Sequence, residues 1–128
     1  MLQLLAVLVA VFGLAGVPST RLSVTVDVGQ PLHTAHATLR CDGTATGTGF
    51  LAEHPKRACR LVGSGAIARV AKAQRSHRAC SQIYGGAQHA RITGTVVHTR
   101  VKLTVTRTNG CGTADWQALY ALLGDPER

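Results

Sequence analysis

The sequence predicts an α+β domain in which helices cover one face of an antiparallel sheet. Two segments near the start of the chain and two near its end alternate apolar and polar residues with the period of β-strands. The block between these pairs of segments has helical character instead. Strands that flank a helical block, without regular β–α–β alternation, are typical of this fold class. At 128 residues the chain is expected to form one domain.

The first twenty residues are predicted to form a secretion signal. Residues 4–17 are an apolar run close to the initiator methionine, and residues 1–20 contain no charged side chain. The run is shorter than the roughly 18 to 20 residues that a spanning helix needs, and small residues near its end suit cleavage somewhere in 15–20. A retained anchor is the alternative, because the charged region before the run is weak. We therefore expect a domain at 21–128 that is secreted and free of the membrane after signal cleavage.

Two alternating segments open the domain and predict a β-hairpin. Residues 21–28, RLSVTVDV, and residues 34–41, TAHATLRC, are separated by a Gly-Gln-Pro break. The residues expected to face the core are Leu22, Val24, Val26, Val28, Ala35, Ala37, Leu39 and Cys41. Residues 42–49, DGTATGTG, predict a flexible connection. They are not a phosphate-binding loop, because no Lys-Ser or Lys-Thr pair follows the glycines.

The central block predicts two short helices. Residues 54–62, HPKRACRLV, have Pro55 at the first helical position, where a missing N–H group costs nothing. A Gly-Ser-Gly break follows. Residues 66–75, AIARVAKAQR, predict the second helix, with Ser64 expected to cap its start.

The C-terminal part predicts a second hairpin and one ambiguous segment. Residues 90–96 and 99–108 alternate as strands, with a turn at Thr93-Gly94 or in the residues that follow. Residues 114–123, ADWQALYALL, have helical propensity, yet their large side chains also alternate as a strand requires.

Four cysteines in an exported chain predict two disulfides. The sequence alone leaves the three possible pairings open. Zinc is the competing interpretation, but the spacings contain no C-x-x-C pair, which structural zinc sites usually have.

The basic character of the domain predicts solubility and weak attraction to anionic surfaces. The net charge is +8, and all of it lies after residue 20. The basic residues are scattered and are not interleaved with aromatic residues, so a nucleic-acid-binding surface is not predicted.

The residues do not predict an enzyme. The few acidic residues are scattered, and the six histidines have no spacing that defines a metal site. Ser81 lacks the Gly-x-Ser-x-Gly motif of many serine nucleophiles. We therefore expect no catalytic activity, no cofactor and no metal.

Five motifs in order give the chain a resemblance to a known family. They are ATLRC, the Gly/Thr-rich loop, HPKRACRLV, CSQIY and TNGC, and the resemblance that they carry covers about residues 21–123. Together they resemble the Streptomyces-type subtilisin inhibitor family of secreted serine protease inhibitors. The resemblance implies a five-stranded antiparallel sheet with two helices on one face, a final strand at 116–122, and a homodimer formed through the sheets. It also implies the disulfide pairs Cys41–Cys59 and Cys80–Cys111.

The resemblance further implies a reactive loop that a subtilisin-like protease would bind as a substrate. The reactive bond would lie between Gln82 and Ile83. The other residues with an implied role are the loop contacts Ala79, Cys80, Ser81 and Tyr84, and the loop supports Asn109 and Cys111. In such a loop the disulfide holds the extended shape, and the Asn109 side chain would bond loop carbonyls across the reactive peptide.

Three departures from the family pattern affect the expected target and affinity. Ser81 replaces a common proline, and Gly85-Gly86 replaces Asp-Pro, so the loop backbone has more freedom. Gln82 lacks the positive charge that a trypsin-type pocket requires, which favours a subtilisin-like target. The alternative function is a non-inhibitory secreted module whose basic surface binds cell-envelope polyanions or another partner.

Overall fold

The computed structural model of the protein describes residues 19–128. The predicted signal segment and its apolar run therefore lie almost entirely outside the described residues. Thr20 belongs to the packed domain, because it is 5% exposed and its carbonyl oxygen accepts a hydrogen bond from Cys41 N at 3.0 Å. Its hydroxyl oxygen accepts another from Val97 N at 3.3 Å. The packed domain thus includes one residue before the predicted boundary at 21.

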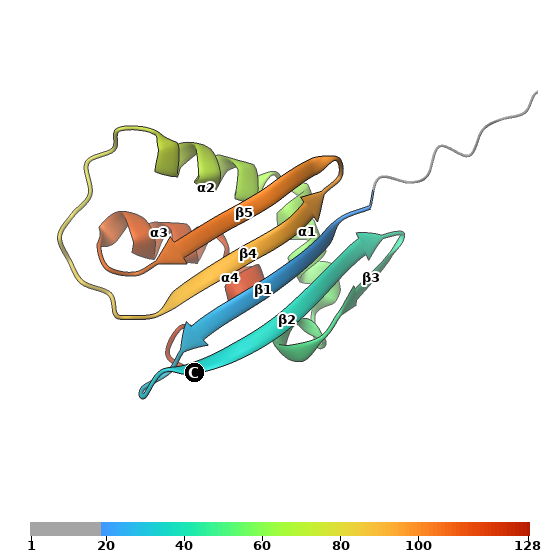
Figure 1. Cartoon of the computed structure of the whole chain (residues 1–128), viewed down its shortest axis with the longest axis horizontal. Helices are drawn as coiled ribbons and strands as arrows, with labels where there is room; N and C mark the ends of the chain where they lie inside the picture. The colour runs from blue at the N-terminus through green and yellow to red at the C-terminus, as the bar shows by residue number, and fades with distance from the viewer. Residues whose placement is uncertain (1–18) are drawn as a thin grey trace, which may run out of the picture.

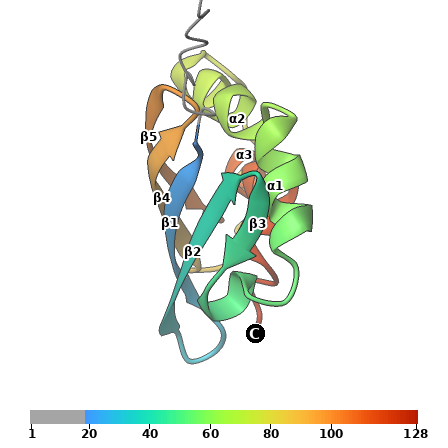
Figure 2. The ribbon, with the colours of Figure 1, turned by 90° about the vertical axis from the view of Figure 1, so that its right-hand side faces the viewer.

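A five-stranded antiparallel sheet forms one layer and the helices form the other, which confirms the predicted α+β fold class (Figures 1 and 2). The strand order is β3-β2-β1-β4-β5. The strands are β1 (Arg21–Val28), β2 (His33–Asp42), β3 (Thr44–Gly47), β4 (His89–Val96) and β5 (Thr99–Thr106). The helices are α1 (Pro55–Gly63), α2 (Ala66–Arg75), α3 (Gly110–Ala118) and α4 (Tyr120–Leu123), with a 3-10 turn at Gly49–Leu51.

The alternation of the strands decides which face the helices cover. In β1 the residues Leu22, Val24, Val26 and Val28 are buried, while the residues between them lie on the opposite face. Helix α1 packs against β2 and β3, α3 against β5, and α4 against β1 and α1. The core lies between these two layers, and its largest fully buried side chains are Trp116, Leu39, Ile92, Leu119, Leu122 and Leu123.

Both predicted hairpins are present. Strand β1 pairs with β2, and β4 pairs with β5. The turn of the second hairpin follows Val96, so the later of the two expected turn positions is the correct one. Gly94 stays within β4, where an added Cβ would lie 2.1 Å from Arg21 O of the neighbouring strand.

The prediction of a flexible connection at 42–49 is wrong. Thr44–Gly47 forms the edge strand β3, which pairs with the end of β2. The glycines serve close packing: a Cβ on Gly47 would lie 2.2 Å from Leu51 O, and one on Gly49 would lie 2.0 Å from His36 O. Their frequency indicated flexibility, whereas their function here is to let backbone segments approach one another.

Both central helices are present, but Ser64 does not cap the second one. Its hydroxyl group donates to Leu61 O at 2.6 Å and so satisfies the end of α1. The N-cap of α2 is Gly65, whose φ of 83° is left-handed. The turn between the helices therefore depends on a glycine conformation and not on a side-chain cap.

The expected final strand at 116–122 is also wrong, because this segment forms α3 and α4. The buried residues Trp116, Leu119, Leu122 and Leu123 follow the helical period. Trp116 Nε1 donates to Gly124 O at 2.9 Å, which gives the buried indole a partner. The fifth strand of the sheet is β3, and the helical layer has four helices where two were expected.

Candidate functional site: the loop between α2 and β4

The segment between α2 and β4 contains the predicted reactive bond and has no regular secondary structure. It runs from the end of α2 around the outside of α3 and into β4 (Figure 1). Ser81, Gln82, Ile83 and Tyr84 are all exposed, and the relative exposures of Ile83 and Tyr84 are 75% and 63%. Exposed apolar side chains beside one another at the tip of a loop favour contact with another molecule.

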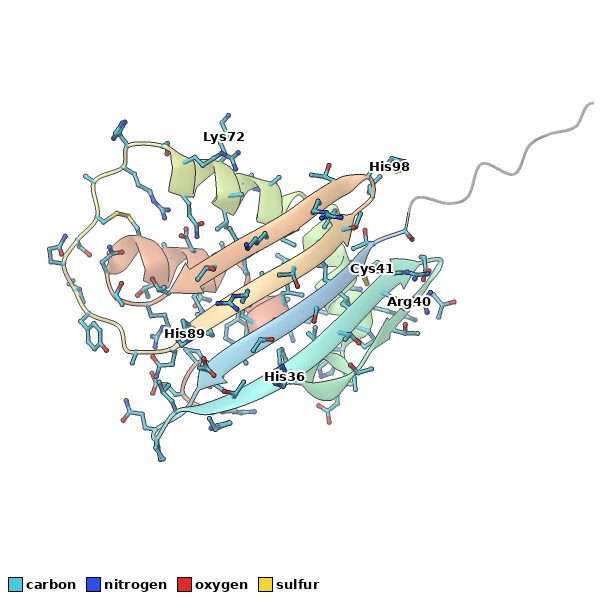
Figure 3. The ribbon with its side chains drawn as sticks, viewed as in Figure 1. His36, Arg40, Cys41, Lys72, His89 and His98 are labelled. Atoms are coloured by element: carbon cyan, nitrogen blue, oxygen red, sulfur yellow. A yellow bond between two sulfur atoms is a disulfide. The ribbon has the colours of Figure 1, made fainter. Side chains whose placement is uncertain are left out.

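A disulfide ties this loop to α3, and both disulfides have the pairing that the family resemblance implied. Cys80 is bonded to Cys111, which lies in the first turn of α3, with a Cα–Cα distance of 5.2 Å. The other pair is Cys41–Cys59, which joins β2 to α1. Figure 3 shows the sulfur bond between the loop and α3. The backbone of Cys80 is therefore fixed two residues before the predicted reactive bond.

Two backbone hydrogen bonds hold the loop on either side of Gln82 and Ile83. Gly110 N donates to Ser81 O at 2.9 Å, and Gly85 N donates to Arg107 O at 2.8 Å. Ser81 is therefore hydrogen-bonded to the first residue of α3, and Gly85 to the residue that follows β5. Together with the disulfide, these bonds restrain both ends of the exposed stretch 82–84.

Asn109 supports the loop in a different way from the one expected. Its side-chain oxygen accepts a hydrogen bond from Gly112 N at 3.0 Å, so it is the N-cap of α3. Among residues 19–128, no hydrogen bond joins its side chain to a carbonyl of the loop. The expected hydrogen bond from the Asn109 side chain to a loop carbonyl is therefore wrong. The backbone N–H group of the adjacent Gly110 donates to the Ser81 carbonyl oxygen instead.

Two close contacts explain why glycines flank this site. A Cβ on Gly110 would lie 2.1 Å from Ser81 Oγ, and a Cβ on Gly85 would lie 2.7 Å from Thr113 Oγ1. Each glycine thus lets the loop backbone lie directly against the body of the domain. The freedom expected from Gly85 is restricted by its hydrogen bond to Arg107.

An ion pair at the start of the loop was not found by sequence reasoning. Arg78 donates to both carboxylate oxygens of Asp115, at 2.9 and 2.7 Å, and Asp115 is 5% exposed. Gln74 Nε2 also donates to Asp115 at 3.4 Å and to Thr104 O at 3.0 Å. The hydrogen bonds that the Arg78 guanidinium donates to Asp115 raise its pKa above the ordinary value. The one available signal was the acidic residue in an otherwise apolar helical segment.

A second polar cluster fixes the other end of the loop. Gln88 is 1% exposed, and its Oε1 accepts a hydrogen bond from Arg107 Nη1 at 3.0 Å. Arg107 also contacts Glu127 near the C-terminus at 3.1 Å. Gly86, with a φ of 142°, lies against the Gln88 side chain. The loop is therefore bounded by Arg78 before it and by Gln88 after it.

Gln82 has a contact of its own within the loop. Its Nε2 donates to Cys80 O at 3.2 Å, so the side chain folds back over the backbone. The interaction is on the surface and involves no charge, so it is weak compared with the disulfide. Gln82 must rotate away from Cys80 before it can enter a pocket of another protein.

The described residues form neither a cluster of metal ligands nor a membrane-spanning helix. Among residues 19–128 no three His, Cys, Asp or Glu side chains are grouped as metal ligands. Within the same residues no helix has the length and hydrophobicity needed to cross a membrane. No protein-family model matches this sequence, and no curated protein is significantly similar to it, so the function is inferred from the geometry of the loop.

Proposed function

We propose that this protein is a secreted serine protease inhibitor that presents residues 79–84 to a subtilisin-like protease, with Gln82–Ile83 as the reactive bond. The observation that supports it best is the restraint of an exposed segment on both sides of that bond. Cys80 is held by a disulfide, Ser81 O by Gly110, and Gly85 N by Arg107. The two disulfides also favour secretion, because such bonds persist in oxidising compartments.

The restraint matters because of the entropy of binding. A protease binds its substrate as an extended strand beside its own backbone, and a free peptide loses conformational freedom when it is bound in this way. A segment that is already held in place loses much less, so more of the contact energy contributes to affinity. The loop would then bind more tightly than a flexible peptide of the same sequence.

The two backbone bonds also leave the reactive residue free. Adjacent residues in an extended chain direct their backbone groups to opposite sides. The Ser81 carbonyl group and the Gly85 N–H group form hydrogen bonds with Gly110 and Arg107. The backbone groups of Gln82 and Tyr84 are therefore expected to face outward, where a protease strand can pair with them.

Restraint on both sides of the reactive bond would also slow release after cleavage. When the protease serine attacks the Gln82 carbonyl carbon, the Ile83 nitrogen leaves as an amine with a proton from the catalytic histidine. That amine remains close, because Gly85 is bonded to Arg107 and Cys80 is covalently bonded to α3. It can attack the acyl-enzyme ester, reform the peptide bond and release the serine hydroxyl. High effective molarity favours this reversal over hydrolysis by water.

Gln82 favours a protease with a broad, neutral specificity pocket. Its side chain is uncharged, so it would leave the buried acid of a trypsin-type pocket without a partner. A subtilisin-like pocket accepts its size. Rotation of Gln82 away from Cys80 O costs one weak hydrogen bond, so the free conformation does not prevent binding.

The proposal is tested by comparing the two disulfides. The purified mature protein is titrated against subtilisin, and residual activity is followed for hours. The variant C80S/C111S is expected to be cleaved at Gln82–Ile83 and to lose inhibition. The matched variant C41S/C59S removes the disulfide remote from the loop and should still inhibit at a temperature where it is folded.

Each variant loses about 3 to 4 kcal/mol of unfolding free energy by the chain-entropy estimate, so stability alone does not separate them. If the wild type is cleaved at this bond without a lasting loss of protease activity, the inhibitor proposal is wrong. The non-inhibitory secreted module then becomes the better interpretation.

A further inference from the structure

The open face of the sheet, which is the face turned away from the helices, carries no apolar side chain in its described strands. The register places alternate residues of all five strands on this face. Figure 3 views it from the front, with His36, His89 and Arg40 labelled on it. Besides these three, the side chains on it are Arg21, Ser23, Thr25, Asp27, Thr34, Thr38, Asp42, Thr44, Thr46, Arg91, Thr93, Thr95, Arg100, Lys102, Thr104 and Thr106.

The basic residues of this face lie in neighbouring rows. Arg21 is directly opposite Arg40 on β2 and Thr95 on β4, and Thr95 is opposite Arg100 on β5. This row crosses three strand spacings, or about 14 Å. Lys102 lies in the next row of β5, opposite Thr93. The basic row therefore crosses most of the sheet, and threonine hydroxyl groups lie between and beside the charges.

One acidic residue, Asp42, lies at this end of the face. Its Oδ2 is 3.4 Å from Arg40 Nη2, at the corner beside β3. Among residues 19–128, Arg21, Arg100 and Lys102 form no ion pair with an acidic residue. Asp27 lies at the opposite end of β1, where it contacts His89 at 2.6 Å and also accepts from Thr34. The face consequently has a positive end at Arg21, and at its other end the acidic Asp27 lies beside His89.

Arg21 and Arg40 are like charges in directly opposite positions, and only Arg40 has an acidic partner, Asp42. Like charges directly opposite on one face of a sheet destabilise the pairing. An anion placed between two guanidinium groups would remove this repulsion, and each planar fork can form two hydrogen bonds to phosphate oxygens. The neighbouring threonine hydroxyl groups can donate to the remaining oxygens.

We infer that the positive end of the open sheet face binds an extended phosphate polymer that carries no bases. A polymer fits a row of charges across several strands better than a single ion does, because it can contact Arg40, Arg21 and Arg100 at the same time. The face has no aromatic side chain on which bases stack, which disfavours single-stranded nucleic acid. It has no apolar side chain to insert among lipid chains, which disfavours a membrane surface.

The test measures binding of the full mature protein to long-chain inorganic polyphosphate by titration calorimetry at several salt concentrations. The variant R21Q/R100Q/K102Q removes three charges from the positive end of the open face. We expect its dissociation constant to rise at least tenfold. A plot of the logarithm of the binding constant against the logarithm of the salt concentration should become less steep, with the magnitude of its slope smaller by about 2 to 3. The control R57Q/K72Q/R75Q removes three charges from exposed positions on α1 and α2. Its dissociation constant should rise less than threefold.

Both variants are assayed for subtilisin inhibition, which neither should lose, so the result does not depend on the reactive loop. Equal weakening of polyphosphate binding by the two variants would show attraction to net charge only and would overturn the inference. Tighter binding of DNA, polyglutamate or dextran sulfate than of polyphosphate would overturn the phosphate assignment. Thermal unfolding of both variants checks that each remains folded.

Discussion

In the proposed inhibitor, Gln82 would decide which proteases the loop can accept, because its exposed side chain precedes the proposed reactive bond. The change Q82K is expected to add trypsin inhibition, since the new ammonium group can pair with the buried acid of a trypsin-type pocket. The inhibition constant for trypsin should fall by about 100-fold, which corresponds to ~2.7 kcal/mol of charge-assisted pairing. Enzyme titration with a chromogenic substrate measures it.

The matched control is Q117K, which places the same charge at an exposed position of α3 outside the loop. It should leave trypsin inhibition unchanged. If Q82K is only cleaved rapidly by trypsin, the loop behaves as a substrate and lacks the proposed restraint. If Q117K has the same effect as Q82K, general electrostatic attraction is responsible.

Gly110 determines how closely the loop approaches α3. The change G110A would place a methyl group 2.1 Å from the present position of Ser81 Oγ and 3.2 Å from Ser81 Cβ, so the Ser81 side chain must rotate and press on the loop. We expect the inhibition constant for subtilisin to rise at least tenfold, with a loss of about 1 to 3 kcal/mol in unfolding free energy from overpacking. Kinetic titration and chemical denaturation measure the two effects.

Gly63 provides the control, because a Cβ there meets no atom within 4 Å. The variant G63A should keep full inhibition and should not lose stability. The double variant S81G/G110A removes the clashing hydroxyl group and is expected to recover part of the lost affinity. Equal inhibition by G110A and the wild type would mean that the loop position at Ser81 does not matter.

Helix α3 is the element that holds the loop, and its buried Asp115 makes the polar contact. The change D115N replaces a carboxylate that accepts two hydrogen bonds from Arg78. We expect a loss of about 1 to 3 kcal/mol in unfolding free energy, because one charge-assisted bond disappears in a buried place. Thermal or urea unfolding measures it, and weaker inhibition should accompany it.

The comparison variant is D42N, which alters the more exposed Arg40–Asp42 pair at the corner of the sheet. Its effect on the free energy of unfolding should stay within about 0.5 kcal/mol. Equal losses from D115N and D42N would contradict the importance of the buried pair.

The stabilisation from Arg78 should not depend on pH near neutrality. The pKa of Arg78 is raised, so the contribution of its charge to stability is complete below the unfolded-state pKa and is lost only in strong alkali.

The elements that sequence predicted correctly are those with long, regular patterns. Strands β1, β2 and β5 alternate over eight or more residues, and Pro55 marks the start of α1. The errors occur where tertiary contacts override local composition. Strand β3 is short and contains glycine, and it forms because β2 extends far enough to pair with it.

In the C-terminal segment, too, the local sequence pattern did not predict the structure correctly. Alternation of large residues at 116–122 suited a strand, but the position of Leu123 beside Leu119 and Trp116 is helical. Within the loop, position and disulfide pairing followed from the motifs, whereas the Gly110 and Arg107 backbone contacts did not. Backbone hydrogen bonds between distant segments depend on the folded geometry, and the residue types in the sequence do not predict them.

At the scale of the whole molecule, the expected homodimer stays a prediction with a definite salt dependence. Association through the open sheet faces would place Arg21, Arg40, Arg91, Arg100 and Lys102 of one copy against those of another. Like charges repel, and salt screens the repulsion. The dimer should therefore strengthen with rising salt, as measured by sedimentation equilibrium. A dimer that weakens with salt would use another surface.

The same face cannot hold a polymer and a second copy at once. Polyphosphate should therefore shift a dimeric sample toward monomer–polymer complexes, whereas salt alone should shift it toward dimer. Sedimentation in the presence of each additive distinguishes the two effects. Unchanged dimer on addition of polyphosphate would mean that the polymer and the partner copy occupy different surfaces.

The first strand enters the sheet at the end that lies away from the loop. Arg21 is opposite Thr95, beside the turn of the second hairpin, whereas Asp27 is opposite His89, where the loop joins β4. The two ends are separated by the length of β1, roughly 25 Å. The last residues lie near the loop instead, because Glu127 contacts Arg107. A carrier protein, dye or bead coupled before Thr20 would lie at the far end of the sheet from the loop. The same attachment after Arg128 would lie at the same end of the sheet as the loop, beside Gly29 in the turn between β1 and β2.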